Sequence, residues 1–72
     1  MRIALTRREQ QVVVLLAAGA PTYREVAETL DCAPQTVRNH VNAIAARLPY
    51  PHLTPKAAVC HYAVEMDKDG VT

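Results

Sequence analysis

The most constraining feature of the sequence is a row of aliphatic residues with helical spacing that begins just after a proline. The row consists of Val37, Val41, Ile44 and Leu48. At about 100° per residue, these side chains fall on one narrow stripe of an α-helix. Pro34 fits the first helical position, because its missing N–H would have no intrahelical partner there. The pattern predicts a helix over residues 34–48 with one buried edge.

Two shorter helices are predicted before it, each opened by a capping box. Thr6 is followed by Glu9 and Thr22 by Glu25 at the same three-residue interval. In such a box the threonine hydroxyl accepts a backbone N–H, while the glutamate reaches back to the N–H of the cap residue. Gly19, with Pro21 shortly after it, is expected to end the first helix.

The second helix is expected over residues 23–30, and a tight turn, residues 31–33, joins it to the helix that begins at Pro34. Ala33 then occupies the cap position of that helix without a capping side chain. A fourth helix is expected after Thr54 and Pro55. Its apolar side would consist of Ala58, Val59, Tyr62 and Ala63. We interpret residues 1–66 as one all-α domain, a compact three-helix core plus a C-terminal helix, and residues 67–72 as a flexible tail.

Length and motifs argue against an enzyme. A chain of 72 residues builds one small core and leaves little room for an enclosed active-site cleft. It has no Ser/His/Asp set, paired carboxylates or glycine-rich phosphate loop. Zinc-like spacing is also missing among Cys32, His40, His52, Cys60 and His61. We expect no catalytic residue, no metal site and no cofactor.

The charge distribution is more informative than the net charge of +1. Residues 1–64 hold seven basic residues against four acidic ones, and the acidic excess lies in the last eight residues. A basic body is compatible with a polyanionic partner. No apolar run approaches the roughly 18 residues that a membrane span needs. Two cysteines do not make a disulfide framework, so we expect a cytoplasmic, nucleoid-associated protein that has no membrane partner.

A short helix, a turn of three residues and a longer helix constitute a helix-turn-helix. The second helix of this motif enters the major groove of DNA. Opposite its apolar stripe, the helix over residues 34–48 carries side chains that suit base edges: Gln35, Arg38, Asn39 and Asn42. Arginine pairs with guanine O6 and N7, and asparagine with adenine N6 and N7. Candidates for phosphate contacts are Thr22, Tyr23, Arg24, Thr36, Arg47 and Lys56.

The sequence resembles the LuxR/GerE-type helix-turn-helix family. The resemblance covers roughly residues 5–64 and rests on residues 5–19, residues 22–30 and the Thr-Val-basic-x-His core at residues 36–40. It implies a four-helix domain that binds promoter DNA, with Arg38, Asn39 and Asn42 at the base-contacting positions. Arg24 stands at the position of the family's phosphate-contacting lysine.

The resemblance also implies a homodimer formed through the fourth helix. The candidate interface residues there are Val59, Cys60 and Ala63. Several positions depart from the family pattern: the loop after Gly19 is one residue longer, Ala33 replaces the usual serine, and Asn42 replaces a basic residue. The segment 49–54 is also longer, and the arginine near the start of the fourth helix is missing. Most members carry a further domain upstream, so the chain is either a stand-alone regulator or an excised domain.

Two other functions fit the same pattern. One is a sigma-factor-like module that contacts promoter DNA beside RNA polymerase, which makes RNA polymerase a further candidate partner. The other is a protein-interaction module that kept the fold and lost DNA binding, as the low net charge and Asn42 would allow. Steep salt dependence of duplex binding separates a DNA reader from the last of these.

Overall fold

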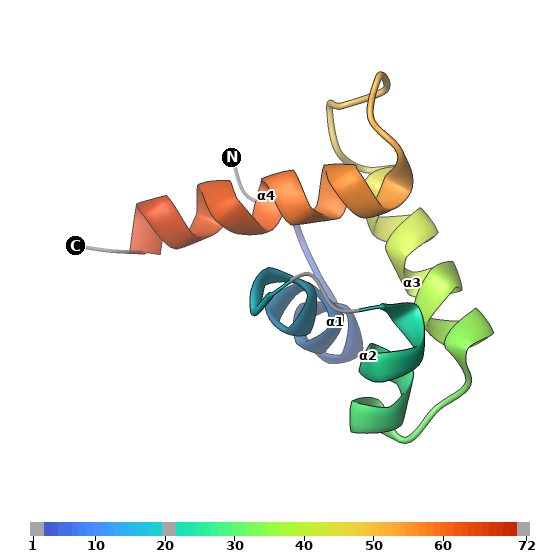
Figure 1. Ribbon diagram of the computed structural model, residues 1–72. Helices are drawn as coiled ribbons and strands as arrows, with labels where there is room; N and C mark the ends of the chain where they lie inside the picture. Colours follow the sequence, from blue (N-terminus) through green and yellow to red (C-terminus); the bar gives the residue numbers. More distant parts are fainter. Residues whose placement is uncertain (1–2, 20–21, 71–72) are drawn as a thin grey trace.

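The computed structural model describes residues 3–19 and 22–70, and over this part of the chain it consists of four α-helices without a strand (Figure 1). The helices are α1 (Arg7–Ala17), α2 (Tyr23–Leu30), α3 (Pro34–Ala45) and α4 (Pro55–Gly70). The predicted all-α class and the predicted four-helix architecture are confirmed. Pro21, which was expected to help end the first helix, lies outside the described residues.

Helix α1 is held at both ends as its sequence predicts. The Thr6 hydroxyl accepts a hydrogen bond from the Glu9 N–H at 3.2 Å, and the Glu9 carboxylate accepts one from the Thr6 N–H at 2.9 Å. This is a complete capping box. The helix ends at Ala17, and Gly19 follows with a φ of +124°, a conformation that side chains disfavour.

Helix α2 occupies the predicted residues and leads into a left-handed turn. The Thr22 hydroxyl accepts from the Glu25 N–H at 3.2 Å, which is the first half of the predicted capping box. Asp31 closes the helix with φ 56° and ψ 51°, a region that aspartate tolerates better than most residues. From α1, the Arg8 guanidinium donates to the Leu30 carbonyl at 3.3 Å and so satisfies an acceptor in the last turn of α2.

Helix α3 is three residues shorter than predicted. It begins at Pro34 after the uncapped Ala33 as expected, but it ends at Ala45 instead of Leu48. After Ala45 the hydrogen bonding changes to the tighter 3₁₀ type. The N–H groups of Arg47 and Leu48 each donate to the carbonyl three residues earlier, at 3.0 Å. Pro49 accounts for the non-helical conformation of Leu48, since a proline disfavours the helical conformation of the residue before it. Leu48 is still buried on the predicted stripe.

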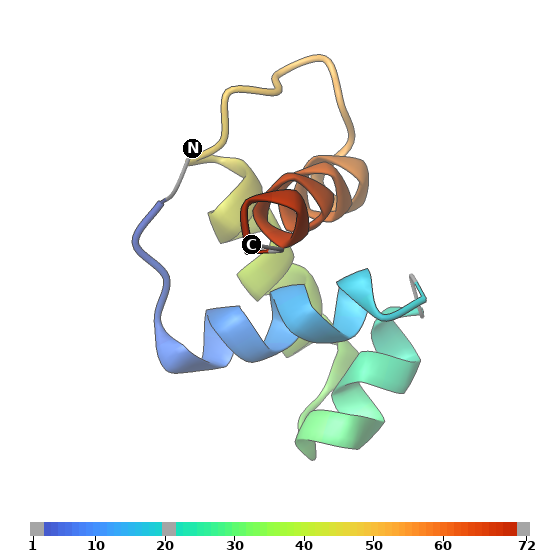
Figure 2. The same cartoon turned by 90° about the vertical axis from the view of Figure 1, so that its left-hand side faces the viewer.

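Helix α4 begins after Thr54, whose hydroxyl accepts from the Ala57 N–H at 3.3 Å. The helix continues to Gly70, so the backbone of residues 67–70, which we had assigned to the tail, is helical. The boundary of the domain at residue 66 and the flexibility of the tail stay predictions. In Figure 2, which looks nearly along α4, α1 passes across its underside.

The core lies where α1 and α3 meet α4, and α2 joins it by packing against α3 and α1. Its fully buried members include Val12 and Leu16 of α1, Val26 of α2, and the stripe of α3. All four residues predicted for the apolar side of α4 are buried in it: Ala58, Val59, Tyr62 and Ala63.

This burial limits what two residues of the predicted dimer stripe can offer to a second copy. Val59 is 0% exposed and Ala63 4% exposed within the single chain. Val59 is enclosed by packing inside the chain, whereas Ala63 is largely covered but still lines an apolar groove at the surface. The interface itself stays a prediction. Cys60 is half-buried. The large apolar side chain that α4 does expose, among its described residues, is Val64.

Candidate nucleic-acid interface

The polar edge of α3 is open to solvent along its length. Its four predicted base-contacting residues are all exposed: Gln35, Arg38, Asn39 and Asn42. The opposite edge is buried through Val37, Val41 and Ile44. The core therefore fixes the rotation of α3 about its own axis. No acidic residue occurs between residues 34 and 48, so this edge carries no charge that would repel phosphate.

Two of these side chains are joined to each other. The Gln35 Nε2 donates to the Asn39 Oδ1 at 3.1 Å, across one helical turn. Residues four apart on a helix are neighbours, so this bond follows from the spacing. It leaves the Asn39 amide N–H groups and the Gln35 carbonyl free of this contact. The pair therefore presents a donor and an acceptor side by side, the combination that an adenine edge requires.

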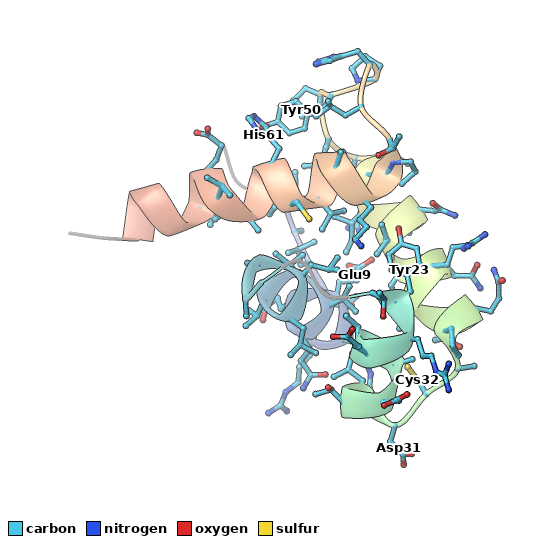
Figure 3. The ribbon with its side chains drawn as sticks, viewed as in Figure 1. Glu9, Tyr23, Asp31, Cys32, Tyr50 and His61 are labelled. Carbon is cyan, nitrogen blue, oxygen red and sulfur yellow. The ribbon has the colours of Figure 1, made fainter. Side chains whose placement is uncertain are left out.

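Helices α2, α3 and α4 bring three of the predicted contact residues to one place. The carbon of the Arg38 guanidinium group lies 5.9 Å from the centroid of the Tyr23 ring, and the Lys56 ammonium nitrogen lies 5.6 Å from it. Tyr23 is half-buried at the start of α2 (Figure 3). Burial raises the pKa of Tyr23, and the positive charge of Arg38 partly opposes this change. The phenol is therefore neutral near pH 7.

The other predicted phosphate contacts lie at helix starts. Thr22 and Arg24 are exposed at the start of α2, and Thr36 is exposed in the first turn of α3. Arg24 forms an ion pair of 3.4 Å with Glu28, and both side chains are largely exposed. Pairs this exposed contribute little and break readily, so Arg24 remains able to reach an anion.

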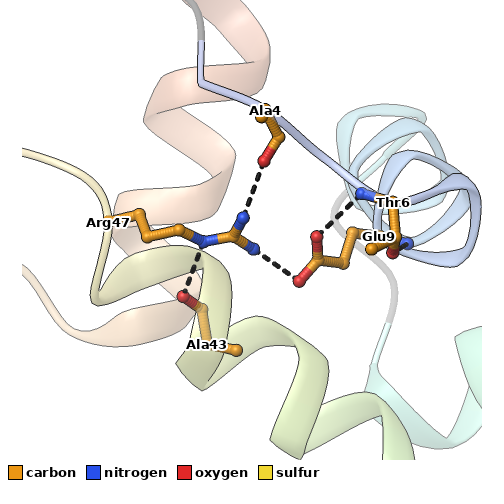
Figure 4. Close-up of polar contacts among 5 residues, drawn as sticks. All are labelled: Ala4, Thr6, Glu9, Ala43 and Arg47. Carbon is orange, nitrogen blue, oxygen red and sulfur yellow. Dashed lines mark hydrogen bonds and ion pairs between the residues drawn. The ribbon is translucent and has the colours of Figure 1, made fainter.

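Arg47 is placed differently from the other predicted phosphate contacts. Its guanidinium group donates to the Ala4 carbonyl at 2.6 Å, to the Ala43 carbonyl at 3.3 Å, and to the Glu9 carboxylate (Figure 4). Glu9 is 7% exposed. These bonds tie the end of α3 to the N-terminal segment and to the first turn of α1. Arg47 thus has a structural role that its sequence neighbourhood did not indicate, and its phosphate contact stays a prediction.

Glu9→Gln is expected to lower the free energy of unfolding by about 1–3 kcal/mol near neutral pH, because the charged bond to Arg47 is lost. Hydrogen bonds from Arg47 and from the Thr6 backbone lower the pKa of Glu9 below 4.5 in the folded chain. The contribution of the carboxylate is therefore complete above pH 4.5 and is lost as the pH falls through the folded pKa.

Urea unfolding of both proteins between pH 7 and pH 3 measures this prediction. The two free energies should converge as the pH falls, and a difference that stays constant down to pH 3 would contradict it. Glu28→Gln is the matched control, because Glu28 is paired on the surface. Its effect should stay within about 0.5 kcal/mol.

The described residues hold no cluster of three or more His, Cys, Asp or Glu side chains that could bind a metal ion. Cys32 and Cys60 are free and half-buried. Among the predicted ligand types, His61 packs edge-on against Tyr50, with ring centroids 4.6 Å apart. In the part of the chain that the structure describes, no helix combines the length and the apolarity needed to cross a membrane.

The arrangement of α2, the turn at Asp31 and α3 defines the protein as a helix-turn-helix domain with an exposed polar edge on its second helix. The family model of the bacterial regulatory proteins of the luxR family, GerE, matches residues 4–60. The chain belongs to this family, whose members are regulators that bind DNA through such a domain. No curated protein and no solved structure matches the chain significantly.

Proposed function

We propose that the protein is a transcriptional regulator that binds duplex DNA sequence-specifically, with α3 in the major groove. The observation that supports this most strongly is the rotation of α3. Its aliphatic edge is packed in the core, while its guanidinium and amide groups face outward without an acidic neighbour on the helix. A helix in this setting can approach base edges without any rearrangement of the domain.

In this proposal the base contacts come from one helix and the phosphate contacts from helix starts around it. Arg38 contacts guanine, and the amide-bearing residues contact adenine or neighbouring bases: Gln35, Asn39 and Asn42. Phosphate contacts come from Thr22, Arg24, Thr36 and Lys56, and from the backbone N–H of Tyr23. N–H groups at the start of α2 add to them, because a helix N-terminus attracts anions.

We also propose that two copies bind DNA together through α4, as the family resemblance implies. Val59 is enclosed in the core and offers no exposed surface to a second copy. The proposal uses Ala63 and Val64 of α4, which line an apolar groove of about 490 Å³ with Val14 and Ala17 of α1. Val14 and Val64 are the large apolar side chains that stand exposed among the described residues. The C-terminal half of α4 points away from α3, so this surface leaves the DNA-facing edge free (Figure 1).

The test starts with selection of bound duplexes from a random pool, followed by affinity measurements with variants. Arg38→Ala is expected to weaken binding to the selected duplex by about 1–3 kcal/mol and to relax discrimination at one base pair. Arg24→Ala is the comparison, because a phosphate contact should weaken selected and random duplexes alike.

Equal losses on selected and random duplexes for Arg38→Ala would refute its role in base reading. If the wild-type chain binds no duplex even at low salt, the DNA-binding function itself fails, and the protein-interaction module becomes the better proposal. A spacing of about 10 base pairs between two selected half-sites would support a dimer that binds one face of the duplex.

A further inference from the structure

Arg38 and Lys56 differ from Arg24 and Arg47 in the kind of group that each cation contacts. Arg24 is paired with Glu28, and Arg47 is paired with Glu9. Within the described residues, neither Arg38 nor Lys56 forms an ion pair, and both lie over the ring of Tyr23 instead.

The group that a cation contacts determines how much positive charge the cation still offers to a phosphate. A carboxylate orients an arginine but neutralises it while the pair lasts, as the buried Glu9 does for Arg47, so an arginine must leave its carboxylate before it can neutralise a phosphate. The face of an aromatic ring attracts a cation through its quadrupole and carries no net charge. A ring therefore orients a cation and leaves its full positive charge available. The desolvated, half-buried setting of Tyr23 strengthens this attraction.

The three residues also come from three different helices. Tyr23 is the first residue of α2, Arg38 lies on the open edge of α3, and Lys56 is the second residue of α4. The ring of Tyr23 thus lies where the side chains of α3 and of the start of α4 come together. That start was the region where the sequence departs from the family pattern, because the usual arginine is missing and the preceding loop is longer.

We propose that Tyr23 is a positioning residue, whose ring holds the Arg38 guanidinium and the Lys56 ammonium groups in fixed directions and without neutralising them. The proposal rests on the DNA-binding function proposed above and adds a mechanism to it. Arg38 reaches its base pair with less conformational freedom to lose, and Lys56 takes over at α4 the cationic position that the missing arginine leaves open. The ring acts on the two cations, so the hydroxyl of Tyr23 is not required for this role.

The first test measures the free protein by NMR. In the wild-type chain the δ-methylene protons of Arg38 and the ε-methylene protons of Lys56 should resonate upfield of their usual positions, because they lie over an aromatic ring. Tyr23→Phe should preserve these shifts, and Tyr23→Leu should remove them. Resonances of Arg38 and Lys56 at ordinary positions in the wild-type chain would overturn the proposal without any use of DNA.

The second test measures affinity for the selected duplex and for a random duplex. Tyr23→Leu is expected to weaken binding to the selected duplex about five- to tenfold, because the two long side chains must then be ordered when the duplex binds. Tyr23→Leu should also reduce the difference in affinity between the selected duplex and a duplex changed at the base pair that Arg38 contacts. Tyr23→Phe should stay within about twofold of the wild type. Tyr50→Leu is the matched control, because Tyr50 is another half-buried tyrosine that packs on His61 instead of on a cation.

The outcomes separate this proposal from the function on which it rests. If the wild-type chain binds no duplex, the proposed function is refuted, while the NMR shifts still decide whether the ring positions the two cations. If Tyr23→Phe loses as much affinity as Tyr23→Leu, the hydroxyl acts directly on DNA and the positioning role is wrong. The positioning role of Tyr23 is also wrong if Tyr23→Leu discriminates as well as the wild type at the base pair of Arg38. The same holds if Tyr50→Leu reduces this discrimination as much as Tyr23→Leu does.

Discussion

Val59→Asp is expected to leave the domain unfolded or to lower its Tm by at least about 15 °C, whereas Val64→Asp should leave the fold intact. Val59 is 0% exposed at the centre of the core, and Val64, five residues later on α4, is 52% exposed. An unpaired carboxylate in a core costs about 3–5 kcal/mol. A domain of 72 residues has a total stability of roughly 4–11 kcal/mol.

Circular dichroism at increasing temperature measures the first part of this prediction, and sedimentation equilibrium measures the second. Val64→Asp should change the Tm by only a few degrees, but it should convert the proposed dimer into a folded monomer. A folded Val59→Asp protein with an unchanged Tm would mean that Val59 faces outward, where the candidate dimer stripe would place it. A Val64→Asp protein that remains dimeric would place the interface elsewhere.

The contrast between these two valines illustrates what local sequence pattern can and cannot predict. The pattern predicted that α4 has an apolar side, and the residues of that side are buried as expected. Most of the helix is apolar or small, however, and periodicity alone cannot say which apolar residues face the core and which face a partner. That choice depends on how α4 crosses α1 and α3, which is a tertiary property.

Helix ends were predictable where the determining groups are close in sequence. Thr6 and Glu9 cap α1 as expected, and α2 has the predicted bounds. The apolar stripe predicts that α3 continues to Leu48, but the helix ends three residues earlier, at Ala45. Burial of Leu48 does not require that it be helical. The restriction that Pro49 imposes on the preceding residue was the signal that could have corrected this.

Long-range polar contacts were beyond the reach of the sequence. Glu9 and Arg47 are 38 residues apart, and each had a plausible local role, Glu9 in a capping box and Arg47 on phosphate. In the structure Glu9 both completes the capping box and binds Arg47, because one of its oxygens accepts from Thr6 and the other from Arg47. Tyr23 is a similar case. Its position at a helix start was evident, but its contact with Arg38 and Lys56 depends on the packing of three helices.

Raising the salt concentration from 50 to 200 mM is expected to weaken binding of the selected duplex by about 150-fold for a dimer and about 12-fold for a monomer. Among the cations predicted to contact phosphate, Arg47 is already neutralised by the buried Glu9 carboxylate. We therefore count Arg24 and Lys56, so each subunit neutralises two phosphates. Each neutralised phosphate adds about −0.9 to the slope of log affinity against log salt. A dimer should therefore show a slope of about −3.6 and a monomer about −1.8.

Affinities at five or six salt concentrations give the slope, and two variants assign it to residues. Lys56→Ala in a dimer should reduce its magnitude by about 1.8, because two phosphate contacts are lost. Gln35→Ala should leave the slope nearly unchanged and act on base preference instead, since an amide releases no counterion. A wild-type slope near zero would mean that the exposed edge of α3 does not face a polyanion. The surface would then be better interpreted as one that binds a protein.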